Sequence, residues 1–169
     1  MILIDRDIEY LALTQQLVSP FNRALLNPAS LDIRVGYNLK LATEDGWCGM
    51  VLDDTTEVEP FWLKPNEFVL VESLELFNFP NNVCGMFKLK SSMGRKGFDH
   101  GEAGFIDPNW TNSRLTMELK NIHPFNQLKL YKGMPIGQIV FMLLNGIPER
   151  DYSEVGHYNN DLKVQEAKY

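Results

Sequence analysis

The most constraining feature of the chain is a series of short strand-like runs, separated by turn residues such as glycine, proline and asparagine. The first run, LDIRVGYNLKLA at 31–42, shows the two-residue period of a half-buried strand. Short strands and turns at regular spacing favour an all-β barrel or sandwich. Further strand-like runs occupy 61–63, 68–76, 83–90, 114–122, 127–131 and 136–144, with a turn at 133–135.

Both ends of the chain depart from this pattern. The segment 5–16 predicts a short helix, because Asp5 opens it and Ile8, Leu11 and Ala12 share one face. From 148 onward the sequence is polar, which predicts a tail that frays in the absence of a ligand. The 169 residues contain no linker or repeat and predict a single domain, 1–169, with 148–169 as its tail.

Composition narrows the class of function. The formal net charge is −6 and no large Lys/Arg cluster occurs, which argues against duplex nucleic acid as the partner. The longest apolar run, 139–144, is too short to span a membrane, and the charged start argues against a signal peptide. Cys48 and Cys84 have no motif around them and are interpreted as reduced, partly buried thiols of a cytoplasmic protein.

Polar chemistry concentrates in one stretch, KSSMGRKGFDHGEAGFIDPNW at 90–110. Zinc nucleoside deaminases need a Cys-x-x-Cys pair, and the two cysteines here lie far apart, so we expect no catalytic zinc. A triad of Ser91 or Ser92 with His100 and Asp107 lacks a nucleophile elbow, and the sequence gives it little support. SSMGR has two interpretations, a polar loop or a tight turn that binds phosphate oxygens.

Glu118 also has two interpretations. In RLTMELKN at 114–121, the two-residue period places Glu118 opposite Met117 and Leu119. The pattern alone favours a solvated face for this carboxylate. If the glycine-rich turn forms a pocket over that face, burial would tune Glu118 for proton transfer.

Seven stretches in this order resemble the dCTP deaminases, which share a superfamily with the trimeric dUTPases. The resemblance covers nearly the whole chain, and the order of the seven is more specific than any one of them. They are MILIDRDIEYL at 1–11, SLDIRVG at 30–36, KSSMGR at 90–95, HGEAGFIDPNW at 100–110, TMELKN at 116–121, GMPIGQIVF at 133–141 and VGHYNND at 155–161.

The resemblance implies a mainly β fold, a distorted barrel or jelly roll with a short N-terminal helix, assembled as a homotrimer with active sites between subunits. It implies deamination of dCTP to dUTP and ammonia without zinc, with Mg²⁺ carried by the triphosphate. Some members continue to dUMP and pyrophosphate, and GFID at 104–107 resembles those members. No nucleic acid or membrane partner is implied.

The resemblance also implies roles for individual residues. Glu118 would be the general base, Ser91 would hold the reacting centre, and Arg95 would orient Glu118 across the subunit interface. The residues implied to contact the nucleotide are Lys90, Ser92 and Gln138 at the phosphates, Ala103, Gly104 and Phe105 at the base, Asp107 at the 3′-hydroxyl with Trp110 nearby, and Tyr152, Tyr158 and Asp161 in the closing tail.

Two acidic residues depart from the family pattern. Glu102 replaces a threonine beside the base, and Asp161 replaces a glutamine of the tail. Asn109 replaces a glycine, a milder change because asparagine tolerates positive φ. Three hypotheses remain open: a dCTP deaminase, a dUTPase-like pyrophosphohydrolase, and a non-catalytic nucleotide-binding regulator.

Overall fold

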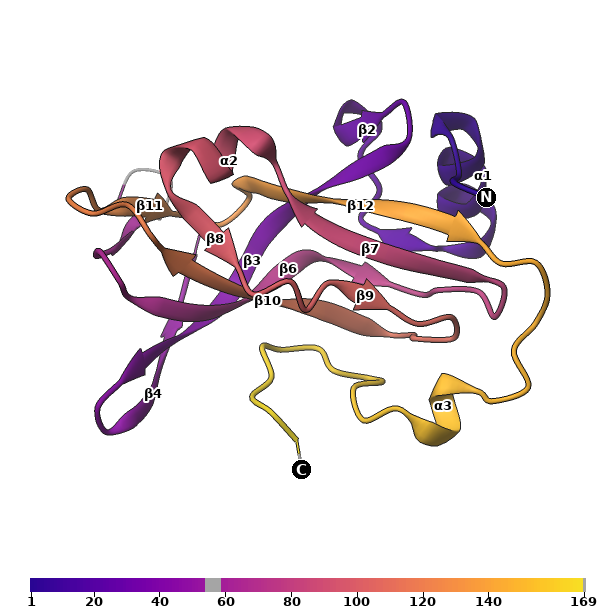
Figure 1. Cartoon of the computed structure of the whole chain (residues 1–169). Helices are drawn as coiled ribbons and strands as arrows, with labels where there is room; N and C mark the ends of the chain where they lie inside the picture. Colours follow the sequence, from indigo (N-terminus) through magenta and orange to yellow (C-terminus); the bar gives the residue numbers. More distant parts are fainter. Residues whose placement is uncertain (54–58, 169) are drawn as a thin grey trace.

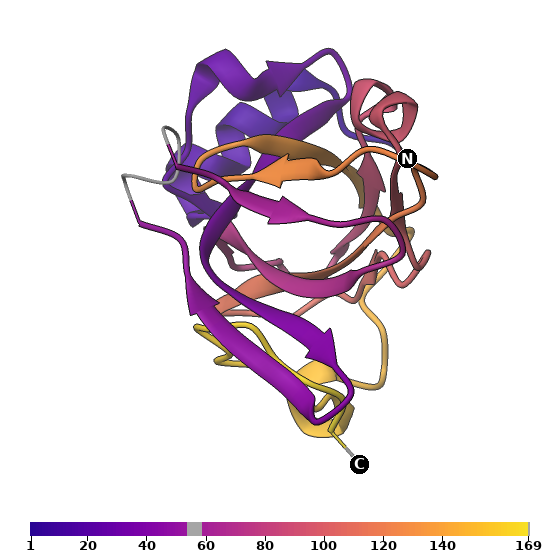
Figure 2. The ribbon, with the colours of Figure 1, turned by 90° about the vertical axis from the view of Figure 1, so that its left-hand side faces the viewer.

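A curled antiparallel sheet forms most of the molecule (Figures 1 and 2). The computed structural model describes residues 1–53 and 59–168. Along the main path the order is β8-β10-β6-β3-β12-β7-β9, and β1, β2 and β4 pair at its side. The path strands are β3 (Ser30–Thr43), β6 (Phe68–Phe77), β7 (Val83–Leu89), β8 (Phe98–His100), β9 (Phe105–Ile106), β10 (Ser113–Asn121) and β12 (Pro135–Leu143).

The remaining elements are short and lie around this sheet. A second sheet has two strands, and both lie where the sequence predicted a strand. A helix lies near the N-terminus. They are α1 (Asp5–Gln15), β1 (Val18–Ser19), η1 (Arg23–Leu25), β2 (Leu26–Asn27), β4 (Gly46–Val51), β5 (Phe61–Leu63), α2 (Ser91–Lys96), β11 (Leu128–Leu130) and α3 (Tyr152–Val155).

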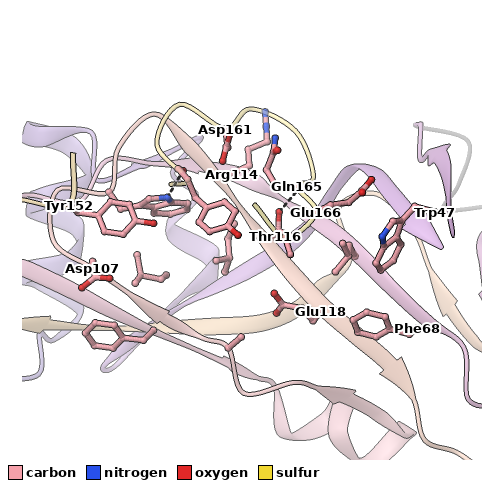
Figure 3. Close-up of a pocket in the computed structure, with 18 residues that line it drawn as sticks. Trp47, Phe68, Asp107, Arg114, Thr116, Glu118, Tyr152, Asp161, Gln165 and Glu166 are labelled. Atoms are coloured by element: carbon pink, nitrogen blue, oxygen red, sulfur yellow. Dashed lines mark hydrogen bonds between the residues drawn. The ribbon is translucent and has the colours of Figure 1, made fainter. Parts of the chain in front are cut away.

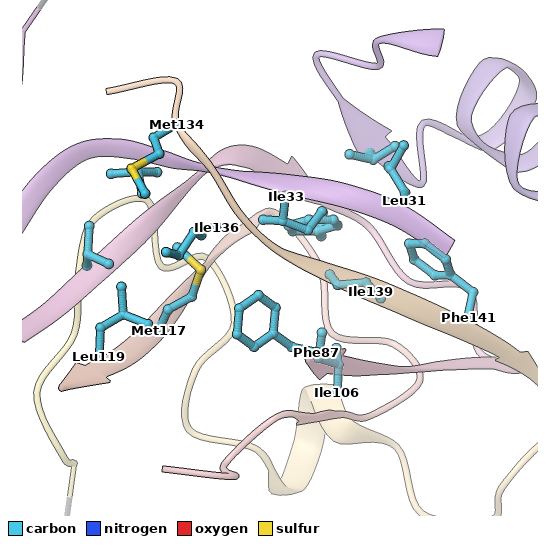
Figure 4. Packing of buried hydrophobic residues seen from close by; sticks show 14 of the residues in the cluster. Leu31, Ile33, Phe87, Ile106, Met117, Leu119, Met134, Ile136, Ile139 and Phe141 are labelled. Carbon is cyan, nitrogen blue, oxygen red and sulfur yellow. The ribbon is translucent and has the colours of Figure 1, made fainter. Parts of the chain in front are cut away.

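The predicted alternation is confirmed in β10, and β12 also packs on the core. Met117 and Leu119 of β10 are buried, and so are Ile136, Ile139 and Phe141 of β12. Figure 4 shows these side chains meeting those of β3, β7 and β9 inside the curl. The helix prediction is also confirmed, since α1 covers 5–15 and buries Ile8 and Ala12. The mainly β class follows from this packing.

Three local predictions were incomplete or wrong. SSMGRK is a short helix, α2, and not an irregular turn, and Gly97 ends it at φ 105°. The sequence did not predict β4, which pairs with the second half of β3 although its side chains are mostly exposed. The predicted polar tail from 148 onward packs along β10, a contact that the sequence pattern did not indicate.

Buried carboxylates brace the centre of the sheet where β6 and β10 change register. Glu75 of β6 is buried, and its Oε1 accepts from Arg34 Nε at 2.6 Å while Oε2 accepts from the Arg34 amide at 3.0 Å. Burial raises the pKa of Glu75, and the Arg34 contacts oppose that rise. This pair fixes β3 against β6 because removing one partner would leave a buried charge.

Gly137 of β12 lies against the ring of Phe87 on the neighbouring strand β7. A Cβ at this position would lie 2.2 Å from Phe87 Cε2 and 2.9 Å from the Lys88 carbonyl oxygen. Overpacking a closed core costs about 1–3 kcal/mol. We therefore expect Gly137→Ala to lower the free energy of unfolding by that amount in urea titration. Gly146→Ala, which meets nothing within 4 Å, is the matched control; equal stability of both variants would contradict the packing.

Candidate active site

A cavity of about 580 Å³ lies between β10, β6, the 103–110 segment and the C-terminal tail (Figure 3). Its size suits a small-molecule ligand. Residues far apart in the sequence meet here because the tail returns to lie against β10. The lining residues are Trp47, Phe68, Leu70, Ala103, Phe105, Ile106, Asp107, Trp110, Arg114, Leu115, Thr116, Glu118, Tyr152, Tyr158, Asp161, Gln165, Glu166 and Ala167.

Glu118 lies within this cavity, opposite Leu70 in the pairing of β10 with β6. The solvated-face prediction for this carboxylate is wrong, and the pocket alternative holds. Its Oε2 atom is buried and has no hydrogen-bond partner among the described residues. Burial raises the pKa of Glu118, since removing water penalises the charged form. A partly desolvated carboxylate with a free oxygen is suited to exchanging a proton with a bound molecule.

The segment before β9 reaches the cavity through a tight backbone path. The Gly104 carbonyl accepts from the Phe87 amide at 2.7 Å, and a Cβ at Gly104 would lie 2.5 Å from the Phe87 oxygen. Only glycine fits so close to β7. This close approach fixes the backbone of the segment against β7, and its neighbours Ala103 and Phe105 line the cavity. Gly104 itself is not among the lining residues, and Glu102 is exposed at φ 58°.

Asp107 and Trp110 form the end of the cavity nearest α3. Burial raises the pKa of Asp107, and burial together with Asp107 raises that of Tyr152. Trp110 is buried on Phe77, with ring centroids 6.0 Å apart. Asn109 adopts φ 64°, as its tolerance of positive φ predicted. This rigid turn holds a carboxylate and an aromatic ring at fixed positions.

The tail forms the outer wall of the cavity. The Tyr158 carbonyl accepts from Trp110 Nε1 at 2.8 Å, and the Asp161 carbonyl accepts from the Arg114 amide at 2.8 Å. Further along, the Gln165 amide donates to Thr116 Oγ1 at 3.0 Å. Tyr158 and Asp161 are thereby placed at the cavity, as are the neighbouring tail residues that no sequence argument had singled out.

A second group of predicted residues lies elsewhere in the same chain. Ser91, Ser92 and Arg95 are exposed on α2, which Figure 1 shows on the opposite side of the sheet from the tail. Lys90 pairs with Asp32, and Gln138 Oε1 accepts from Ser30 Oγ at 2.7 Å. None of these five residues lines the cavity. One chain therefore holds the predicted site in two separate halves.

The cavity half is acidic. Asp107, Glu118, Asp161 and Glu166 line it, and Arg114 is the one Lys or Arg among its described lining residues. Arg114 already donates to the Ser73 carbonyl at 3.0 Å. A polyanionic ligand would need cations from outside this group, because like charges at close range repel.

Several cavity residues were missed from the sequence. Thr116 shares the two-residue period of Glu118, so this signal was available. Trp47 and Phe68, whose ring centroids lie 5.9 Å apart, carried no comparable signal. Trp47 reaches the cavity from β4, an element that the pattern did not predict.

Other expectations concern metals, membranes and thiols. Among the described residues, no group of three or more His, Cys, Asp or Glu side chains is placed to hold a metal ion. The described helices include none that is both long and apolar enough to cross a bilayer. Cys48 and Cys84 are free thiols, as predicted, and Cys84 is buried; the expected partial burial of Cys48 is wrong, because Cys48 lies on the mostly exposed strand β4.

The chain matches known families over most of its length. A family model described as dCTP deaminase-like matches residues 2–144. A relative from Mycolicibacterium smegmatis named "dCTP deaminase, dUMP-forming" is 36% identical over 164 residues, covering 90% of this chain and 86% of its own. A Rhodococcus opacus protein of the same name is 34% identical with the same coverage.

Solved structures show the same fold. The 2′-deoxycytidine 5′-triphosphate deaminase of Agrobacterium tumefaciens superposes with a TM-score of 0.67 at 18% identity, covering 84% of this chain and 48% of that one. This chain thus spans about half the length of that protein. A dUTPase from Streptococcus mutans superposes with a TM-score of 0.52 at 18% identity, covering 76% of this chain and 92% of its own. The fold is therefore dUTPase-like.

Because burial raises the pKa of Glu118, the free energy of unfolding should depend on pH through this group. A carboxyl whose folded pKa is raised contributes stability that is present below its unfolded pKa, about 4.3, and lost as the pH rises through the folded value. Glu118→Gln removes this loss, so we expect the variant to unfold at higher urea concentration than the wild type at neutral pH. The difference should vanish in acid.

The control for that measurement is Glu102→Gln, which alters an exposed carboxylate nearby and should change stability little at either pH. A Glu118→Gln protein that is less stable than the wild type at neutral pH would show that burial is not the dominant influence on this side chain.

Proposed function

This chain belongs to the dCTP deaminase family, and we propose that it converts dCTP to dUTP and ammonia and then hydrolyses dUTP to dUMP and pyrophosphate. The observation that carries the proposal is the buried, unpartnered carboxylate oxygen of Glu118 in a nucleotide-sized cavity. The second step is supported by the relatives named dUMP-forming at 34–36% identity. The segment Gly104–Asp107, with Phe105 before Ile106, also resembles the family members that continue to dUMP.

Glu118 would act as the general base of the first step. It takes a proton from water as the water oxygen attacks C4 of cytosine, and it returns the proton to the departing amine. Burial raises the pKa of Glu118, which favours the protonated form that would return the proton to the amine. Thr116 and the backbone of 103–105 would position the base beside this carboxylate.

The other end of the cavity would hold the sugar. Asp107 would accept from the 3′-hydroxyl, Trp110 would pack beside the deoxyribose, and Tyr152 and Tyr158 would close over it. Figure 3 shows Asp107 and Tyr152 at one end of the cavity and Glu118 nearer the other, so the sugar would lie beside Asp107 and the base beside Glu118. Mg²⁺ would enter as part of the substrate, bound to the triphosphate.

The phosphates would be bound by a second copy of the chain. The cavity is acidic, and the predicted phosphate ligands Lys90, Ser92 and Gln138 lie outside it together with Arg95. In a homotrimer, α2 of one subunit could complete the cavity of the next, with Ser91 and Arg95 approaching Glu118. Each of the interfaces in the closed ring of subunits would then form one active site. We place this enzyme in the cytoplasm, with neither membrane nor nucleic acid as a partner.

The general-base role predicts the effect of removing the charge. Glu118→Gln should lower the rate of ammonia release from dCTP by at least about 100-fold, the lower end of what a positioned base contributes. Binding of dCTP, measured by calorimetry, should persist because the amide is of the same size. Full ammonia release by this variant would exclude Glu118 as the base.

The shared site predicts complementation between two inactive variants. We expect Glu118→Gln and Arg95→Ala each to be inactive alone, and co-expressed chains to regain activity at about a quarter of the sites, the fraction in which both intact faces meet by chance. Mixing Glu118→Gln with the double variant is the control and should restore nothing. Absence of recovery in true mixed oligomers would place Arg95 and Glu118 in the same subunit's site.

A further inference from the structure

Lys168 makes an unusually complete set of contacts within the tail. Its Nζ donates to both carboxylate oxygens of Asp161, at 2.7 and 2.9 Å, and to the His157 carbonyl at 2.9 Å. The ammonium also lies 5.0 Å from the centroid of the Tyr158 ring, and the Lys168 amide donates to the Tyr158 hydroxyl at 3.1 Å. A lysine has three N–H donors, and here each has an acceptor.

The partner of this lysine is itself held against the sheet. The Asp161 carbonyl accepts from the Arg114 amide at 2.8 Å, and its amide donates to Ser113 Oγ at 3.2 Å. The Asp161 side chain is only 13% exposed. Lys168 therefore ties the far part of the tail to a point already fixed on β10, and it closes a loop that contains Tyr158.

Two further ties hold the stretch between these residues. The Val164 amide donates to Glu72 Oε2 at 3.0 Å, and Glu72 is a buried carboxylate of β6. Lys40 Nζ lies 2.6 Å from Glu166 Oε1. Contacts within one chain thus hold the tail wall against β3, β6 and β10.

We propose that Lys168 is a positioning residue that fastens the C-terminal tail over the cavity through Asp161 and Tyr158. The proposal rests on the proposed function, because the cavity that the tail covers is the active site assigned there. Lys168 binds both carboxylate oxygens of Asp161, and this contact together with the Lys168–Tyr158 contact is called the clasp below. Asp161 is the anchor of the clasp on β10. The positive charge of Lys168 offsets the negative charge that Asp161 would otherwise present to the phosphates.

The clasp predicts how substrate binding depends on the tail. A tail that is closed before binding costs the substrate no ordering, whereas an open tail lowers the apparent affinity by the fraction of closed molecules. The pair is partly exposed, since the Lys168 side chain is 36% accessible, so salt should weaken it. Loss of the clasp should therefore raise KM and leave the chemical step intact.

Hydrogen exchange of the full-length protein without nucleotide tests the clasp directly. In Lys168→Met, we expect the amides of 158–167 to exchange about tenfold faster, the effect of leaving a charged hydrogen-bond partner unpaired. Lys168→Arg should keep most of the protection. The matched control is Lys163→Met, which removes the same charge from the same tail at a side chain that has no ion pair to any described residue.

Equal protection of the wild type and Lys168→Met would overturn the proposal, and so would equal loss in Lys163→Met. Asp161→Asn combined with Lys168→Met should lose no more protection than either change alone, because both break one pair. Additive losses would show that the two residues act separately.

Kinetics with dCTP separate the clasp from the proposed function. Lys168→Met should raise KM about three- to tenfold with kcat nearly unchanged, and high salt should narrow the gap to wild type. A fall in kcat at constant KM would contradict a positioning role. If the wild type turns over no dCTP while the exchange result holds, the clasp stands and the proposed function fails.

Discussion

The register of β10 against β6 decides what this molecule can do. Glu118 pairs with Leu70 while its neighbours Met117 and Leu119 enter the core. A slip of one residue would send the carboxylate into the apolar interior and the methionine into the cavity. The burial of two apolar neighbours therefore holds Glu118 at the cavity wall. The fixed position of this charge, and its raised pKa, follow from ordinary core packing.

The same cavity is chemically incomplete in one chain. It offers the carboxylates of Glu118 and Asp107 and several aromatic rings, but Arg114 is the one Lys or Arg among its described lining residues, which is little positive charge for a triphosphate. The serines and arginine of α2 lie exposed on the other side of the sheet. Association of several copies would answer both observations, since it would cover α2 and bring positive charge to the phosphates.

The sequence predicted the fold well where local pattern and tertiary burial agree. The strand at 31–42 follows from its two-residue period, and those at 68–76 and 136–144 follow from strand-like apolar runs bounded by turn residues. β4 was missed because its side chains are largely exposed and so show no such period. The α2 helix was missed because its serines and glycine favour turns locally.

The site was predictable in its parts and less so in its assembly. Resemblance identified Glu118, Asp107 and Tyr158, and the structure brings these three to one cavity. Pattern could not place the β10 carboxylate in a pocket, since the tail that covers it lies some forty residues further along the chain. The polar composition of that tail also concealed its order, which depends on pairing of Lys168 with Asp161 and on the buried Glu72.

The most direct test of the account is to incubate the protein with dCTP and Mg²⁺ in water enriched in heavy oxygen, and to weigh the nucleotide product by mass spectrometry. Two hydrolytic steps predict dUMP that carries one heavy oxygen at C4 of the base and one on its phosphate. Unchanged dCTP, or dCMP formed by loss of pyrophosphate with the amine retained, would contradict the assignment of Glu118 as the base of a deaminase.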